Sequence, residues 1–380
     1  MVNFFSAMAV VMDRGACYTE VSSCNNVGLT MKKGILLSFV CAALLLSGCA
    51  KTESQVVYAM NTVMEFTVHG SDPAAVIGEM TKRVNELEGL LSRTRAESEV
   101  SALNDAQGAD TEVSFEVWSL LSQAREAAEA TSGAFDPTIA PVVSAWGFGE
   151  EAYRVPGETE LEQLLGTVGY SGITLGEGQG TYLAALRPEQ SIDLGGIAKG
   201  YASDCMADIF LDYDIDHGCV NMGGNVMAWG TKEDGSPWRV GVKDPGNTGS
   251  LCGVLELESA YAVTSGGYER YFEEGGKTYH HIIDPATGRP AESDLLSVTI
   301  VMDWKAERLN GKCGNGTICD ALSTALFVMG EEEALEFWRG GTYDFEMILV
   351  TADGRVLATP GAAAVFQPTE GSGYAYETVS

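Results

Sequence analysis

The stretch that most constrains this chain lies at residues 191–204 and reads SIDLGGIAKGYASD. The pattern predicts a short strand that ends in Asp193, a turn at Gly195-Gly196 and a helix directly afterwards. Glycines at such a junction let backbone groups approach a ligand closely, and the start of a helix favours an anion. Tight packing explains the same pattern without any ligand, so the stretch needs support from other segments.

Hydrophobic periodicity predicts a mixture of helices and strands along the rest of the chain. Helices are expected at residues 73–91, 115–130 and 158–166, from the glycine pair to about 211, and at 318–329 and 331–338. Strands are expected at 56–68, near 173 and 182, within 219–283, and at 298–302, 347–350 and 356–358. Since no repeat or linker interrupts them, residues 56–360 are predicted to form one α+β body. Residues 361–380, rich in small and polar residues, are expected to be a loose tail.

The amino-terminal part of the sequence has the pattern of a secretion signal. Residues 31–33 (MKK) are positively charged, residues 35–46 carry no charge, and residues 46–49 (LSGC) place small residues before a cysteine. The uncharged stretch fits the core of a signal peptide, about 7–15 residues, better than a membrane span of about 20. The alternative is an anchor helix that is not cleaved.

We therefore expect a lipoprotein signal peptide at residues 31–48 and a tether at residues 49–55. A lipidated Cys49 would hold the protein at the cell membrane, facing outside the cytoplasm. Residues 1–30 fit neither a signal nor a domain, and we interpret them as an over-long gene start.

The composition excludes nucleic acid as a partner, because 53 acidic residues face 23 basic ones and the net charge is −30. The same charge gives no attraction to anionic lipid, so the acyl chain must hold the protein at the membrane. None of the nine cysteines forms a C-x-x-C pair, which argues against a zinc site. Cys313 and Cys319 either close a small loop as a disulfide or remain thiols.

Several polar residues occupy positions that suit either a turn or a ligand. Asp136 directly precedes a proline, a pair that commonly starts turns. Residues 220–225 (VNMGGN) hold a second glycine pair, for which a tight turn or bulge is the structural explanation. His280 and His281 are adjacent on a predicted strand, so they point to opposite faces and cannot share one metal. One of the two could still act as an acid, base or donor.

Asp320 and Thr324 are four residues apart on a predicted helix and therefore lie on one face. A carboxylate beside a hydroxyl suits a hard cation such as Mg²⁺, which prefers oxygen ligands. The alternative is that Asp320 caps the helix while Thr324 lies in the core.

Eight segments in this order resemble one family: residues 60–64 (MNTVM), 98–104 (SEVSALN), 133–136 (GAFD), 193–200 (DLGGIAKG), 221–225 (NMGGN), 264–266 (TSG), 281–285 (HIIDP) and 320–324 (DALST). The chain resembles the ApbE family of FAD:protein FMN transferases, which are often lipoproteins. The resemblance covers about residues 56 to 350. It implies a T-fold-related α+β fold with a mostly antiparallel core and FAD in a cleft.

The resemblance also implies the activity and the residues that carry it. Members transfer FMN from FAD to a threonine or serine hydroxyl of a target protein, with Mg²⁺, and release AMP. The implied magnesium ligands are Asp320, Thr324 and the backbone carbonyl of Ala198, with Asp320 also counted as catalytic. His281 is the implied base toward the hydroxyl. The implied FAD contacts are Met60, Ala134, Phe135, Asp136, Asp193 and Lys199.

The chain departs from the family at one place. Members often have an aromatic residue after Leu-Leu-Ser, whereas this chain reads Arg93-Thr94-Arg95, so a contact with FAD at Thr94 is in doubt. Two alternatives to the transferase are a magnesium-dependent FAD pyrophosphatase and a lipoprotein that binds FAD without chemistry. No segment matches an acceptor motif ending in Gly-Ala-Thr or Gly-Ala-Ser well, so the acceptor is expected to be a separate protein.

Overall fold

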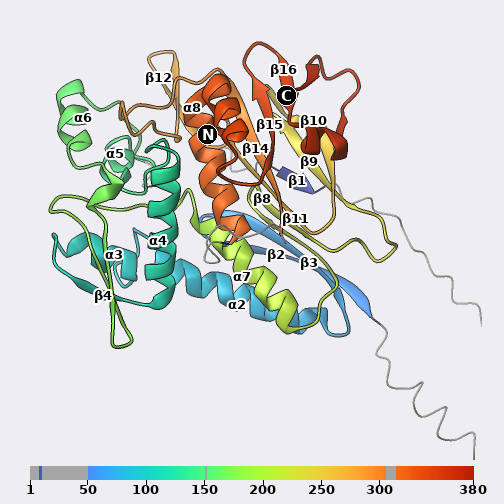
Figure 1. The fold of residues 1–380 in the computed structure, drawn as a ribbon, viewed down its shortest axis with the longest axis horizontal. Helices are drawn as coiled ribbons and strands as arrows, with labels where there is room; N and C mark the ends of the chain where they lie inside the picture. Colours follow the sequence, from blue (N-terminus) through green and yellow to red (C-terminus); the bar gives the residue numbers. More distant parts are fainter. Residues whose placement is uncertain (1–7, 11–49, 150–151, 305–313) are drawn as a thin grey trace, which may run out of the picture.

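The computed structural model describes residues 8–10, 50–149, 152–304 and 314–380. Among them, the largest sheet has nine strands in the order β18-β16-β15-β14-β11-β8-β7-β3-β2 (Figure 1). Neighbours are antiparallel except β16 and β18, which confirms the expected α+β class and mostly antiparallel core. The strand bounds are β2 Lys51–Ala59, β3 Thr62–Gly70, β7 His217–Met222, β8 Asn225–Trp229, β11 Ala260–Gly266, β14 Leu295–Asp303, β15 Glu346–Thr351, β16 Arg355–Ala358 and β18 Ala375–Thr378.

Helices cover one face of this sheet and a smaller sheet covers the other (Figure 1). On the helix side lie α2 Pro73–Leu91, α7 Ala198–Asp212 and α8 Asn315–Gly340. The smaller sheet consists of β1 Met8–Val10, β9 Trp238–Asp244, β10 Asn247–Leu257 and β17 Phe366–Pro368. Val226 and Ala228 of β8 are buried against the smaller sheet, whereas Met227 between them belongs to the core under the helices. Alternate side chains of β8 therefore belong to the two cores on opposite faces of the sheet.

A third part of the molecule lies beside the helix layer (Figure 1). It contains α3 Glu99–Asp105, β4 Thr111–Val113, α4 Phe115–Ala130, α5 Ala140–Ala145, α6 Glu158–Leu165, the short helix η1 Tyr170–Gly172, β5 Thr174–Gly178 and β6 Thr181–Ala185. A hairpin of β12 Tyr271–Glu274 and β13 Lys277–His280 lies nearby. A separate buried group, which we call the side core, contains Val142, Trp146, Phe148, Leu161 and Ile283. It joins α5 and α6 to the segment that follows β13.

Helix α8 contains the break that the sequence predicted. Its two halves meet at Gly330, whose φ of 80° and ψ of −179° are not helical. The backbone N–H of Glu331 donates to Asp294 Oδ1 at 2.9 Å, which satisfies one of the amides exposed where the second half begins. The first half begins at Asn315, three residues earlier than residue 318.

The beginnings of α7 and α8 are packed backbone against backbone. A Cβ added to Gly200 would lie 2.2 Å from the carbonyl oxygen of Gly316, so no larger residue fits without a shift. Asp204 of α7 accepts hydrogen bonds from the N–H groups of Gly316 and Thr317, both at 2.9 Å. The Asp204 carboxylate therefore caps α8, and its desolvation at this contact raises its pKa.

The structure corrects two expectations about the ends of the domain. Residues 51–55 of the expected tether belong to strand β2, which pairs with β3 over its full length. Residues 361–380, expected to be loose, lie mostly in α9 Pro360–Val365, β17 and β18. Strand β18 pairs with β16, so the last residues are part of the main sheet. Both ends were misjudged because their residues are mostly polar and exposed, so their backbone pairing leaves no hydrophobic pattern in the sequence.

The signal peptide and Cys49 lie outside the described residues, as does Cys313, so the expectations about them stay predictions. Met8–Val10, within the expected over-long start, pair with β9. None of the described helices is both long enough and apolar enough to span a membrane.

Candidate functional site

The first turn of α7 meets α8 at Asp320. The backbone N–H of Gly200 donates to Asp320 Oδ2 at 2.9 Å, and Lys199 Nζ lies 3.6 Å from Asp320 Oδ1. Asp320 is only 3% exposed and lies in the second turn of α8, so it does not cap its own helix. It caps α7 instead, and this brings Asp320 beside Ala198, the first residue of α7.

Thr324 lies one turn further along α8, beside the glycine turn that precedes α7. Its Oγ1 is 3.3 Å from Ser265 Oγ and would be 3.6 Å from a Cβ at Gly196. The same Cβ would be 3.2 Å from Phe135, so an aromatic ring closes the turn from the other side. The structure thus brings together Asp320, Thr324 and the segment of Ala198, as the resemblance implied.

These three residues fit a hard cation in the chemistry of their donors. A carboxylate, a hydroxyl and a backbone carbonyl are all oxygen ligands, which Mg²⁺ prefers and completes with water and phosphate. Within the described ranges, no three His, Cys, Asp or Glu side chains gather into a metal site. A cation here would rest on the single carboxylate of Asp320.

Asp193 and Asp136 have different surroundings, although the resemblance makes both FAD contacts. Asp193 Oδ1 accepts from Gly195 N and Oδ2 from Arg93 Nε, both at 2.8 Å, with the carboxylate partly exposed. Asp136 is buried, and its oxygens accept from Thr138 N at 2.8 Å and Tyr170 N at 2.9 Å. Burial raises the pKa of Asp136, while the hydrogen bonds of Thr138 and Tyr170 oppose that rise. The Asp136 carboxylate therefore holds its own turn together.

Met60 lies in the two-residue turn between β2 and β3, where Met60 and Asn61 have φ of 48° and 58°. Arg270 Nη2 donates to the carbonyl oxygen of Asn61 at 3.2 Å. This hydrogen bond connects the turn to Arg270, the residue before β12. The carbonyl oxygen of Arg270 in turn accepts from His281.

The second glycine pair forms the two-residue turn between β7 and β8, as its structural explanation predicted. A Cβ at Gly223 would lie 2.0 Å from Thr62 Oγ1, so this turn packs directly on the start of β3. Asn225, which is 1% exposed, has no hydrogen-bond partner for either atom of its amide among the described residues. A buried amide in that state suits contact with a polar ligand.

His281 is held by the backbone opposite it. Its backbone N–H donates to the carbonyl oxygen of Arg270 at 3.0 Å, and Nδ1 of its ring lies 3.2 Å from the same oxygen. A proton on Nδ1 makes this second hydrogen bond and leaves Nε2 as the acceptor. Burial, assisted by the charge of Arg270, lowers the pKa of His281 to about 3, so the ring is neutral at neutral pH.

His280 faces another part of the molecule, as the alternation along a strand predicted. Its Nε2 lies 3.1 Å from the carbonyl oxygen of Ala291, and its ring meets the ring of Phe327 edge-on with centroids 5.5 Å apart. The two histidines are therefore not equivalent, because the ring of His281 contacts the carbonyl oxygen of Arg270 and the ring of His280 that of Ala291.

Glu269 directly precedes Arg270, the residue that contacts His281, but it was not identified from the sequence. Its Oε1 is buried and has no hydrogen-bond partner among the described residues. Burial raises its pKa to about 7; Lys199 and Arg270 oppose the rise, and Asp320 adds to it. Its position three residues after the TSG motif was the only available signal, and that spacing carries no chemistry by itself.

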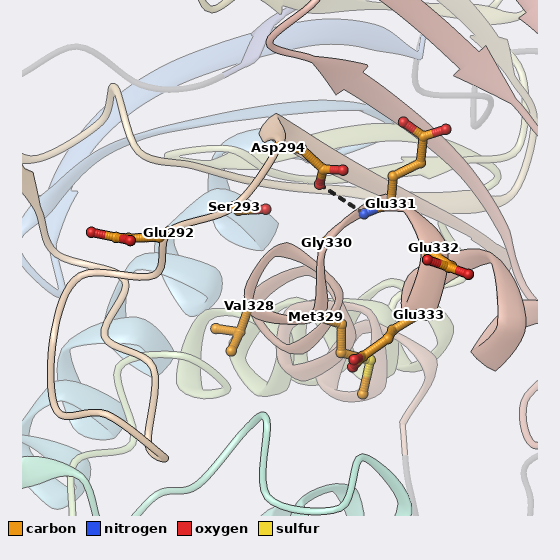
Figure 2. Close-up of a pocket in the computed structure, with 9 residues that line it drawn as sticks. All are labelled: Glu292, Ser293, Asp294, Val328, Met329, Gly330, Glu331, Glu332 and Glu333. Atoms are coloured by element: carbon orange, nitrogen blue, oxygen red, sulfur yellow. Dashed lines mark hydrogen bonds between the residues drawn. The ribbon is translucent and has the colours of Figure 1, made fainter.

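A pocket of about 380 Å³ surrounds the break at Gly330 (Figure 2). Four glutamates and one aspartate are among its lining residues, which are Glu292, Ser293, Asp294, Val328, Met329, Gly330, Glu331, Glu332 and Glu333. Figure 2 shows that these carboxylates point in different directions rather than toward one centre. The pocket shares no residue with the implied FAD contacts, and its negative charge would repel a diphosphate. The cleft for FAD stays a prediction.

The raised pKa of Glu269 can be tested through the pH dependence of the protein's thermal stability. In the unfolded chain this carboxyl ionises near pH 4.5, while the folded protein keeps the proton up to about 7. Its contribution to the free energy of unfolding therefore falls as pH rises between these values and stays low above them. Glu269→Gln should raise Tm relative to the wild type by more at pH 8 than at pH 5, measured by thermal unfolding with EDTA present.

The exposed Glu273 of β12 provides the matched control. Glu273→Gln should change Tm equally little at both values of pH. An equal effect of Glu269→Gln at pH 5 and pH 8 would contradict the burial of an uncharged carboxyl.

Comparison with known proteins identifies relatives along most of the chain. A family model described as the ApbE family matches residues 60–349. The FAD:protein FMN transferase of Vibrio cholerae serotype O1 is 32% identical over 324 residues, which cover 82% of this chain and 92% of that protein. The FAD:protein FMN transferase of Treponema pallidum is 31% identical, and the match covers 86% of this chain and 93% of that protein.

Solved structures agree with these sequence matches. The ApbE protein of Thermotoga maritima has a TM-score of 0.74 at 33% identity, over 83% of this chain and 99% of that one. The flavinyl transferase ApbE of Pseudomonas stutzeri has a TM-score of 0.69 at 26% identity, over 84% and 95%. Family model, sequence relatives and fold all agree, and the chain belongs to the ApbE family.

Proposed function

We propose that this chain transfers FMN from FAD to a threonine or serine hydroxyl of a separate acceptor protein, in a magnesium-dependent reaction that releases AMP. The observation that carries the proposal is the 2.9 Å contact between Gly200 N and Asp320 Oδ2. It brings the Asp320 carboxylate to the start of α7 beside Lys199, and Thr324 lies one turn further along α8. Relatives named FAD:protein FMN transferase support the same activity.

The residues around this point fit the binding of a diphosphate. The start of α7 and the ammonium group of Lys199 both favour a negative charge, although the chain as a whole has a net charge of −30. The carboxylate of Asp320, the hydroxyl of Thr324 and the carbonyl of Ala198 would hold Mg²⁺. The ion would neutralise the diphosphate and stabilise the leaving AMP.

His281 fits the role of base toward the incoming hydroxyl. Its Nε2 would take the proton of the acceptor hydroxyl, whose oxygen attacks the phosphorus of the FMN half. The bond between that phosphorus and the bridging oxygen breaks, and AMP leaves with the bridging oxygen. The positive charges of Arg270 and Lys199 lower the pKa of His281. A bound diphosphate would offset these charges and so favour the protonated His281 that results.

One assay separates the three candidate activities. The protein is incubated with FAD, Mg²⁺ and a candidate acceptor domain, and the products are resolved. Flavin fluorescence that stays on the denatured acceptor supports the transferase. Free FMN with AMP would replace it by a pyrophosphatase, and FAD recovered intact would replace it by a carrier.

We also propose that Cys49 carries a lipid and holds the domain on the outer side of the cell membrane. Strand β2 begins at Lys51, so the folded domain would begin two residues from the anchor. Fatty-acid labelling that persists in Cys49→Ala would contradict this.

Asp320→Asn tests the metal role without removing the hydrogen bond to Gly200, because the amide oxygen still accepts. The loss of charge should lower transfer by about 10²-fold or more and abolish its response to Mg²⁺, measured by magnesium titration. Asp294→Asn is the matched control, since Asp294 also accepts a backbone N–H at α8. Equal loss in both variants, or an unchanged response in Asp320→Asn, would remove the metal assignment.

His281→Gln tests the base. Transfer should fall by about 10²–10⁴-fold, while the Kd for FAD, measured by flavin fluorescence, stays close to that of the wild type. His280→Gln should keep most of the activity because His280 contacts the carbonyl of Ala291 and not the proposed site. Transfer at the wild-type rate by His281→Gln would assign the base to another group.

A further inference from the structure

The guanidinium of Arg93 binds two segments that are far apart in the sequence, one at Asp193 and the other at residues 144–148. Its Nε donates to Asp193 Oδ2, its Nη1 to Ser144 Oγ and its Nη2 to the carbonyl oxygen of Phe148, all at 2.8 Å. The side chain is only 13% exposed. A planar group with donors in three directions makes these contacts at once, which a lysine cannot do.

The first of these segments carries the start of α7. Asp193 is fixed on both oxygens, since Oδ1 accepts from Gly195 N at 2.8 Å and Oδ2 accepts from Arg93. The glycine turn that follows leads directly to Ala198 and Lys199. Arg93 therefore acts on the side of the site that would hold the diphosphate and the cation.

The second segment supports His281. Phe148 is buried in the side core together with Ile283, which lies two residues after His281. The rings of Phe148 and His281 lie edge-on with their centroids 6.4 Å apart. By holding the carbonyl of Phe148, Arg93 also acts on the side of the site that carries the proposed base.

The backbone beside Phe148 leaves room for the guanidinium. Gly149 has φ of +95°, and a Cβ there would lie 2.6 Å from Arg93 Nη2. A residue with a side chain at position 149 would therefore displace the end of Arg93. Gly149 therefore offers a way to move the guanidinium without substituting Arg93 itself.

We infer that Arg93 is a positioning residue. Its three hydrogen bonds, which we call the clamp, hold the side of the site around Asp193 and the side around His281 at a fixed separation. The inference rests on the proposed function, since it concerns the distance between the bound phosphate and the base. Transfer needs the phosphorus and the base in line. A shift of about 1 Å between reacting groups can lower a rate by about 10²-fold.

The test uses Arg93→Lys and Arg93→Met, with Arg95→Met as the matched control. Arg95 has the same charge but is 49% exposed and pairs only with Glu88 among the described ion pairs. With saturating FAD and acceptor, both Arg93 variants should transfer FMN at least about tenfold more slowly, while the Kd for FAD rises by a smaller factor. Arg95→Met should match the wild type in both measurements.

A second pair of variants tests the clamp without removing Arg93. Gly149→Ala should reproduce the slow transfer, because its Cβ displaces the guanidinium. Gly235→Ala is its control, since Gly235 has φ of +81° and open space around a Cβ. Wild-type rates in Arg93→Lys and Gly149→Ala would overturn the inference.

Hydrogen exchange in the protein without FAD separates this inference from the proposed function. In Arg93→Met, amides in residues 144–149 and 193–197 should exchange faster together, whereas Arg95→Met should leave them unchanged. Faster exchange combined with no transfer by the wild type would refute the proposed function and keep the clamp. Unchanged exchange in both segments would refute the clamp itself.

Discussion

The site depends on the reciprocal capping of α7 and α8. Asp320 of α8 accepts from an N–H in the first turn of α7, and Asp204 of α7 accepts from two N–H groups in the first turn of α8. Both helices begin with amides that have no partner within their own helix, so each supplies what the other lacks. The close approach of Gly200 and Gly316 makes the exchange possible, because a Cβ on either residue would meet the other helix.

Electrostatics explains why one buried carboxylate can serve such a site. The chain carries far more acidic than basic residues, yet Lys199, Arg270 and Arg93 all lie in the region of Asp193, Asp320 and His281. A doubly charged diphosphate therefore meets local positive charge in a protein that would otherwise repel it. Burial, with the charges of Arg270 and Lys199 adding to it, lowers the pKa of His281 and keeps the ring neutral, as a base must be before it accepts a proton.

The sequence predicted the longer helices well, but it missed the short helices α3, α5 and α9 and both ends of the domain. The helix at residues 73–91 was placed correctly, because its apolar residues recur at the helical period. Strand β18 was missed because its partner β16 is some twenty residues away and its own residues are mostly exposed. Periodicity reports burial on one face, whereas β18 is held mainly through its backbone.

The candidate site was predicted through the resemblance more than through local pattern. Spacing placed Asp320 and Thr324 on one face of a helix. It could not show that the start of α7 contacts Asp320, because Gly200 lies 120 residues before Asp320 in the sequence. Arg93 was noticed only as a departure from the family, because nothing in Arg93-Thr94-Arg95 indicates which arginine is buried. Glu269 lacked any local signal, because its raised pKa results from burial in the folded chain.

The exchange of caps between α7 and α8 also has a dynamic consequence. Fraying at the start of one helix would strip a partner from the start of the other, so the two ends should open and close as a single cooperative unit. A ligand seated between them would hold both ends closed by mass action. The diphosphate site and the local rigidity of the helix layer are therefore two aspects of one equilibrium.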